Sequence, residues 1–124
     1  MLILTPKDNL FNYDEAKKLH DQYADLLEDG CEFDELINYS HFFSFYDGEK
    51  FIGCIYFYKK DGKTFVNAFA GRKTHKSNIE CLKKALNFYK CDIYANSTQK
   101  TAILCLLRAG FKKTDNNLYI YKRR

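Results

Sequence analysis

Four basic side chains lie close together near the middle of the chain: Arg72, Lys73, His75 and Lys76. An apolar run precedes them and an amphipathic run follows, so they occupy the turn where a strand enters a helix. Cations at a helix N-terminus oppose the helix macrodipole, whereas the free backbone N–H groups there bind anions. The cluster therefore predicts an anion site, and phosphate is the chemistry it fits. The alternative is a solvated basic turn.

An antiparallel meander is expected to position this turn. Three runs of alternating hydrophobicity are separated by Asp47-Gly48 and Asp61-Gly62, and such Asp-Gly pairs are typical of tight hairpins. The predicted strands are residues 42–46, 51–58 and 64–70. A helix that begins near Ser77 or Asn78 and a strand over residues 91–95 come next, which indicates a right-handed parallel crossover.

The remaining elements complete a mixed sheet. Residues 2–4 form a first strand; Asp8 or Asn12 caps a helix that runs to about Glu28; residues 33–39 add one or two helical turns; residues 99–109 form a second long helix; and residues 111–113 and 118–121 form two last strands or one hairpin. In the helix over 99–109 the inward side chains are expected to be Ala102, Ile103, Leu106 and Leu107. We predict a single α+β domain over residues 1–124, with six to seven mostly antiparallel strands, one parallel crossover and three to four helices.

Composition narrows the class of protein. With 46% hydrophobic and 17% aromatic residues in 124 positions, the chain predicts a packed core and excludes disorder. Its net charge of +4 is too small for a dedicated nucleic-acid binder, although residues 8–35 are acid-rich and residues 72–90 are basic. The five cysteines form no C-x-x-C pair, so we expect no metal site and a reducing compartment. We expect a cytoplasmic protein without a membrane span or a signal peptide.

Residues 96–111, NSTQKTAILCLLRAGF, resemble the segment N-x-x-A-x-x-x-Y-x-x-x-G-F of the GNAT superfamily of N-acetyltransferases. Gln99 falls on the Asn, Ala102 on the Ala, and Gly110-Phe111 on the Gly-Phe. The predicted order of elements is also similar to that of the superfamily. The resemblance implies a GNAT-like fold and acetyl-CoA, or another acyl-CoA, as co-substrate.

The resemblance also implies which residues contact the co-substrate. The R/Q-x-x-G-x-G/A segment that wraps the pyrophosphate in the superfamily falls on residues 72–77, where His75 and Ser77 replace the two glycines. The Tyr that often protonates the leaving thiolate falls on Leu106, which has no proton to donate. The implied binding residues are Phe69, Ala70, Gly71, Arg72, Lys73, His75, Lys76, Ser77, Asn78 and Gln99.

The catalytic residues stay open at this stage. Acetyl transfer to an amine needs a base, either direct or through water, and residues 64–70 contain no Asp, Glu or His. By order along the chain the candidates are Tyr94, His41 and Asp92. Asn67 interrupts an apolar strand and is either a solvent-facing residue or part of the site.

Two functions follow from these observations. The first is an acyl-CoA-dependent N-acyltransferase that acetylates an amine of a small molecule or a protein by direct attack. The second is an inactive GNAT-like module that acts through a protein partner or as a homodimer, with the acidic first helix as its contact surface. An open cleft between residues 64–70 and 91–95 distinguishes the two, because the thioester arm of CoA needs that space.

Overall fold

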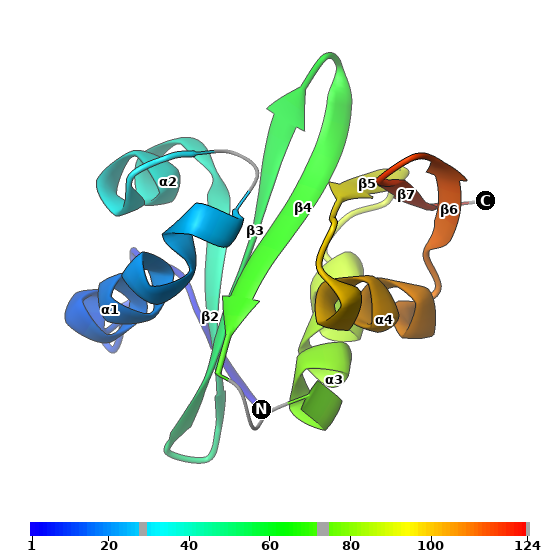
Figure 1. Cartoon of the computed structure of the whole chain (residues 1–124). Helices are drawn as coiled ribbons and strands as arrows, with labels where there is room; N and C mark the ends of the chain where they lie inside the picture. Colours follow the sequence, from blue (N-terminus) through cyan, green and yellow to red (C-terminus); the bar gives the residue numbers. More distant parts are fainter. Residues whose placement is uncertain (28–29, 72–74, 124) are drawn as a thin grey trace.

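The computed structural model describes residues 1–27, 30–71 and 75–123 (Figure 1). These residues form one sheet in the order β1-β2-β3-β4-β5-β7-β6, in which only β4 and β5 are parallel neighbours. The strands are β1 (Leu2–Leu4), β2 (His41–Asp47), β3 (Lys50–Lys60), β4 (Lys63–Ala70), β5 (Ile93–Asn96), β6 (Lys112–Asp115) and β7 (Leu118–Tyr121). The helices are α1 (Tyr13–Tyr23), the 3₁₀ helix η1 (Ala24–Leu26), α2 (Phe33–Tyr39), α3 (His75–Leu86) and α4 (Lys100–Ala109).

The predicted mixed sheet, with its meander and one parallel crossover, is confirmed. Two helix boundaries were predicted wrongly. The first helix ends at Tyr23 instead of about Glu28, because the chain tightens into η1 and leaves it extended at Leu27. The helix after the basic turn begins at His75, earlier than the capping residues Ser77 and Asn78 indicated.

Local chemistry explains most of the boundaries. Asn12 caps α1 by accepting a hydrogen bond from the backbone N–H of Glu15 at 3.0 Å. At the β3–β4 hairpin, Asp61 (φ 53°) and Gly62 (φ 74°) both adopt left-handed backbone conformations, as a tight two-residue hairpin requires. Gly110 ends α4 at φ 112°, and its N–H reaches the last carbonyls of the helix.

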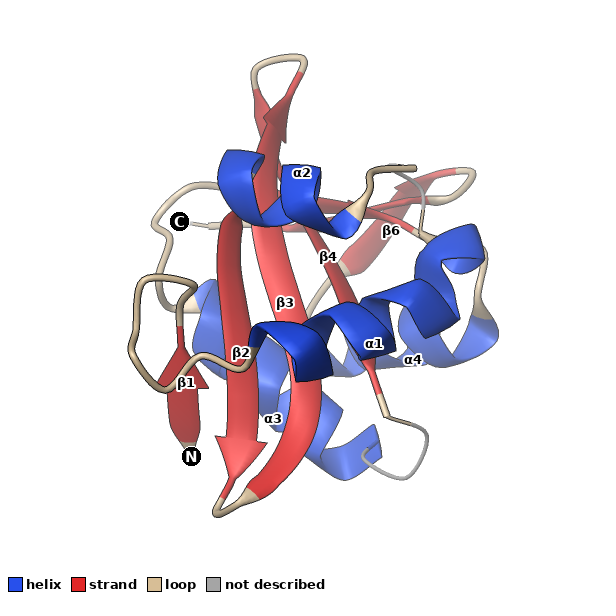
Figure 2. Cartoon of the chain, turned by 90° about the vertical axis from the view of Figure 1, so that its left-hand side faces the viewer, coloured by secondary structure: helices blue, strands red, loops and turns tan. Residues whose placement is uncertain are grey.

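Helices cover both faces of the sheet. Figure 2 shows α1 and α2 in front of the strands and α3 and α4 behind them. Each face has its own apolar cluster. The cluster beneath α1 and α2 contains Phe33, Phe42, Tyr56 and Phe69, and the one beneath α3 and α4 contains Phe45, Ile55, Leu86 and Ile93. The helices of the described residues are too short and too polar to cross a membrane.

Candidate functional site

The two edges of β4 are held very differently. Its edge toward β3 is paired along the whole strand, through eight residue pairs from Lys60↔Lys63 to Gly53↔Ala70. On the edge toward β5, only Thr64 and Phe65 are paired, with Ile93 and Tyr94. Beyond Phe65 the two parallel strands separate, as Figure 1 shows. The backbone of residues 66–70 is therefore left without a strand neighbour on that side.

Gly53 explains why the end of β4 follows β3. A Cβ at this position would lie 2.5 Å from the carbonyl oxygen of Phe69 and 2.8 Å from the Cα of Ala70. Only glycine permits so close an approach of two backbones. The register between β2 and β3 slips beside it, so that Ile52 is the extra residue of a bulge. The bulge and the glycine draw the end of β4 toward β3 and away from β5.

A cavity of about 670 Å³ occupies the gap that this leaves. Side chains on a strand alternate between its two faces, yet consecutive residues from Val66 to Gly71 all line the cavity. The cavity therefore runs along the edge of β4, and it also reaches Phe45, Ile52 and Ile55 on the face covered by α3 and α4. Its other walls come from β2 (Phe45), β3 (residues 52–55), α3, the end of β5 with Ser97, α4, and the end of α1 with η1.

The structure brings together half of the residues that the sequence assigned to the co-substrate. Five of them line the cavity: Phe69, Ala70, Gly71, Asn78 and Gln99. Lys76 is exposed and Ser77 half-buried in the first turn of α3, next to the cavity but outside its lining. Arg72, Lys73 and the side chain of His75 lie outside the described residues.

The catalytic candidates lie elsewhere. His41 is exposed at the start of β2, where its Nδ1 is 2.7 Å from the hydroxyl of Tyr89, and partial burial lowers its pKa below 6.5. Tyr94 is half-buried, and its ring packs against Phe65 at 5.8 Å. Asp92 accepts hydrogen bonds from the C-terminal tail. None of the three belongs to the cavity lining.

The described lining holds polar groups but no ionised side chain. Asn67, Asn96, Ser97 and Thr101 supply amides and hydroxyls. Asn67 thus lines the cavity, and its Oδ1 accepts from the N–H of Ala68 at 2.9 Å. Leu106, at the position where the superfamily often has a Tyr, is buried and also lines the cavity. Proton transfer at this site therefore depends on water or on groups outside the described lining.

Three cysteines line the same cavity: Cys54, Cys81 and Cys105. Burial raises the pKa of the Cys54 and Cys81 thiols to about 12 and also raises that of Cys105. A thiol is nucleophilic only as its thiolate, and these thiols stay protonated at neutral pH. These three cysteines are therefore poor nucleophiles at neutral pH. In the described residues no group of three His, Cys, Asp or Glu side chains is placed to bind a metal ion.

Sequence reasoning missed the wall formed by Tyr23, Leu26 and Leu27. The sequence placed these residues in one continuous helix that runs to about Glu28, but the helix ends at Tyr23, the chain tightens into η1, and all three residues line the cavity. It also missed Asn96 and Ser97, although polar residues at the carboxyl end of a strand next to a parallel crossover are a known ligand signal. Ser97 is buried, and its Oγ accepts from the N–H of Gln99 at 3.2 Å.

Comparison with known proteins identifies the fold. No family model matches the sequence, and no curated protein matches it either. An N-acetyltransferase from Staphylococcus aureus Mu50 superposes with a TM-score of 0.68 at 14% identity, over 98% of each chain. An acetyltransferase from Bacillus subtilis in complex with CoA gives 0.55 at 14% identity, over 91% of this chain and 77% of the other. The chain has a GNAT-like fold that matches bacterial N-acetyltransferases over nearly its whole length.

Proposed function

We propose that this chain binds acetyl-CoA, or another acyl-CoA, and transfers the acyl group to an amine. The observation that carries the proposal is the cavity along the free edge of β4. It opens where β4 and β5 separate, and it is bounded by the strand ends and helix that the sequence assigned to CoA. A filled gap would have favoured the inactive module instead.

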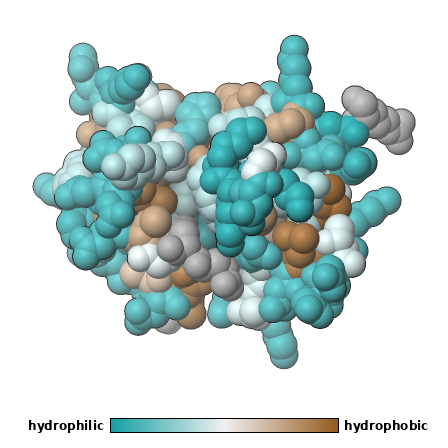
Figure 3. Space-filling view, turned by 90° about the horizontal axis from the view of Figure 1, so that it is seen from above, coloured by the Kyte–Doolittle hydropathy of each residue, from teal (hydrophilic) through white to brown (hydrophobic). Residues whose placement is uncertain are grey.

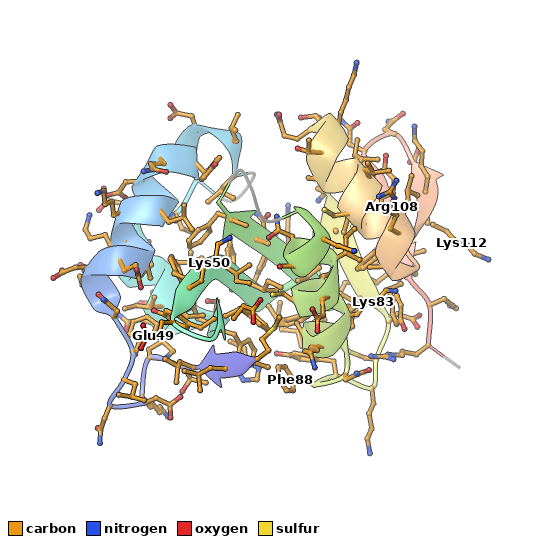
Figure 4. The ribbon with its side chains drawn as sticks, turned by 90° about the horizontal axis from the view of Figure 1, so that it is seen from below. Glu49, Lys50, Lys83, Phe88, Arg108 and Lys112 are labelled. Carbon is orange, nitrogen blue, oxygen red and sulfur yellow. The ribbon has the colours of Figure 1, made fainter. Side chains whose placement is uncertain are left out.

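The residues around the cavity fit the chemistry of CoA. The α3 end of the site is a helix N-terminus, the end of a helix that attracts anions, with Lys76 in its first turn and no acidic residue there. Residues 75–123 hold ten basic and three acidic side chains, a net charge of +7. In Figure 4, Lys83, Arg108 and Lys112 project from α3, α4 and β6 on this side of the molecule. The field of this half attracts the phosphates of CoA.

The extended arm of CoA matches the edge of β4. Beyond the two residues that pair with β5, the edge of β4 lines the cavity, and an amide-bearing chain is held by a strand edge as an added strand is. The transfer itself is a direct attack. The amine nitrogen forms a bond to the thioester carbonyl carbon, the C–S bond breaks, and the proton lost by nitrogen is taken up by the CoA thiolate through solvent.

Calorimetric titration with acetyl-CoA and with CoA tests the binding step. Wild-type protein is expected to bind both, and ligand at 100 times Kd raises the free energy of unfolding by about 2.7 kcal/mol. Ala68 is exposed and lines the cavity from the edge of β4. Ala68→Trp fills this space and is expected to weaken CoA binding by at least roughly 100-fold, since a bulky ring excludes the ligand from a shaped site.

Lys59→Trp is the matched control, because Lys59 is exposed near the tip of the β3–β4 hairpin and outside the cavity lining. Equal CoA affinity in the two tryptophan variants, or no binding by the wild type at millimolar CoA, overturns the proposal. Binding that is lost only in Ala68→Trp, together with no acetylated product from any amine by mass spectrometry, favours the inactive module.

A further inference from the structure

We infer that the acceptor is a primary amine carried on a hydrophobic body, which packs against a wall formed by Tyr23, Leu26 and Leu27. This inference rests on the proposed function and names the class of its second substrate. The wall comes from the end of α1 and from η1, where a turn closed by the N–H of Leu27 and the carbonyl of Ala24 at 3.3 Å fixes the leucines. All three side chains line the cavity.

The exposure of the leucines indicates a ligand contact. Leu26 is 51% exposed on η1, and Leu104 is 40% exposed on α4; both line the cavity from different elements. Exposed large apolar side chains that border one cavity are typical of sites that bury an apolar ligand. From above, Figure 3 shows small hydrophobic areas within a mostly hydrophilic surface. Leu107, 48% exposed on α4, does not line the cavity and provides a comparison within the same helix.

The position of the wall assigns it to the acceptor and not to a longer acyl chain. Tyr23 and Leu27 pack with the cluster that contains Phe69, on the face of the sheet covered by α1 and α2. Of the residues assigned to CoA, Phe69 belongs to this same cluster, whereas Asn78 lies on α3 and Gln99 directly precedes α4, and these two helices pack against the other face. The cavity lining includes residues of both clusters, so we place the body of the acceptor against the end of α1 and the phosphate end of CoA toward α3.

Charge supports an amine on this side. Residues 1–27 and 30–71 hold seven basic and eleven acidic side chains, a net charge of −4, opposite in sign to the CoA half. Asp21 and Asp25 are exposed on α1 and η1, next to the wall in the sequence, and Asp21 forms an ion pair with Lys17 at 2.8 Å while Asp25 has no ion pair among the described residues. This field attracts an ammonium to the entrance. Within the described lining no carboxylate pairs with it, and burying an unpaired charge is costly, so the amine reacts as its free base.

The test measures binding of two amines to the CoA-saturated protein by calorimetry. The probes are 2-phenylethylamine, which carries one amine on an apolar body, and spermidine, which has several charges and no apolar body. We expect 2-phenylethylamine to bind and to be acetylated when acetyl-CoA replaces CoA. We expect no spermidine binding.

Two variants locate the contact. Leu26→Ser is expected to weaken 2-phenylethylamine binding roughly tenfold, the scale of losing an apolar pocket contact, while CoA affinity stays unchanged. Leu107→Ser changes an equally exposed leucine outside the lining, and we expect it to change neither the affinity for 2-phenylethylamine nor the affinity for CoA.

Two results would overturn the inference: tighter binding of spermidine than of 2-phenylethylamine, or equal affinity for 2-phenylethylamine in the two variants. If CoA still binds in those cases, the proposed function stands. If Leu26→Ser instead weakens only long-chain acyl-CoA, the wall belongs to the acyl group and the inference is wrong. Failure of the wild type to bind CoA overturns both.

Discussion

One edge of β4 is paired to its end and the other is paired only at its beginning. Eight residue pairs join β4 to β3, and two join it to β5. The paired edge is tight because Gly53 lets the backbones meet, and the free edge is where the cavity forms. The difference teaches that a cavity at the edge of a strand in this sheet does not require an irregular strand. It requires a regular strand that is paired along its whole length with one neighbouring strand while the other neighbouring strand diverges from it.

The diverging strand, β5, is fixed on its other edge. β5 pairs with β7 over all four of its residues. After β7, Arg123 donates to the carbonyls of Leu86 and Tyr89 at the end of α3, and Asp92, just before β5, accepts from the N–H of Arg123 at 2.8 Å. The C-terminal tail thus fixes both the helix and the strand that form the far wall of the cavity.

The largest effect on stability is expected from a substitution of Gly53, where the backbones of β3 and β4 approach each other closely. Gly53→Ala places a methyl group against the backbone of Phe69 and Ala70, so the strands must separate. We expect a loss of about 2–3 kcal/mol in the free energy of unfolding, measured by urea denaturation, and weaker CoA binding because the end of β4 shifts. Gly62→Asn is the control, since Gly62 has open space and Asn tolerates its positive φ. Equal stability of Gly53→Ala and Gly62→Asn would show that the close contact at Gly53 does not hold the end of β4 against β3.

A smaller effect on stability is expected from removing the contacts of Arg123, which connect the C-terminal tail to the end of α3. Arg123→Ala removes two hydrogen bonds to the end of α3 and the cation–π contact with Tyr121 at 4.7 Å. Because Arg123 is half-buried, we expect about 1–2 kcal/mol of lost stability. Arg108→Ala, on the exposed surface of α4, removes the same charge without these contacts and is expected to be nearly neutral. If both variants unfold at the same urea concentration, the tail does not hold the wall.

The smallest effect is a pH dependence at the start of β5. The backbone N–H of Arg123 and the ammonium of Lys122 lower the pKa of Asp92 below its ordinary 3.8. A depressed carboxyl pKa stabilises the fold above the unfolded-state value, and this contribution disappears as the pH falls through the folded-state value. Asp92→Asn should therefore be slightly less stable than the wild type near neutral pH and equal to it well below pH 3.8. Thermal unfolding across this range measures the difference.

Asp115→Asn controls for the loss of one negative charge, because Asp115 is exposed in β6. A difference between wild type and Asp92→Asn that persists unchanged in strong acid would contradict an ionised Asp92 as its cause.

The sequence predicted the paired edge of β4 better than its free edge. The Asp-Gly turns and alternating runs specify a meander, since both are properties of neighbouring residues. The inward face of α4 was harder. Leu106 is buried as expected and Ile103 packs against the core, but Ala102 and Leu107 are exposed and Ala109 is buried in their place. Ala102 lines the cavity and does not pack against the core.

The site was predicted in the same uneven way. Gly71, Asn78 and Gln99 reach the cavity because they flank the elements that enclose it. Tyr94 was placed by its order along the chain, and order does not fix the face of a strand on which a side chain lies. Gly53, a single glycine within an apolar strand, was a sign of close backbone approach that is visible in the sequence.

The sequence by itself determined the strands, the order of the helices, and a basic segment next to the start of α3, because turn chemistry, periodicity and capping act over a few residues. Only the tertiary structure decided that β4 and β5 separate after two pairs, and that Tyr23, Leu26 and Leu27 face the resulting space. Both depend on contacts between elements that are far apart in the chain. The twist of the sheet and the absence of a Cβ at Gly53 set where the walls of the cavity lie.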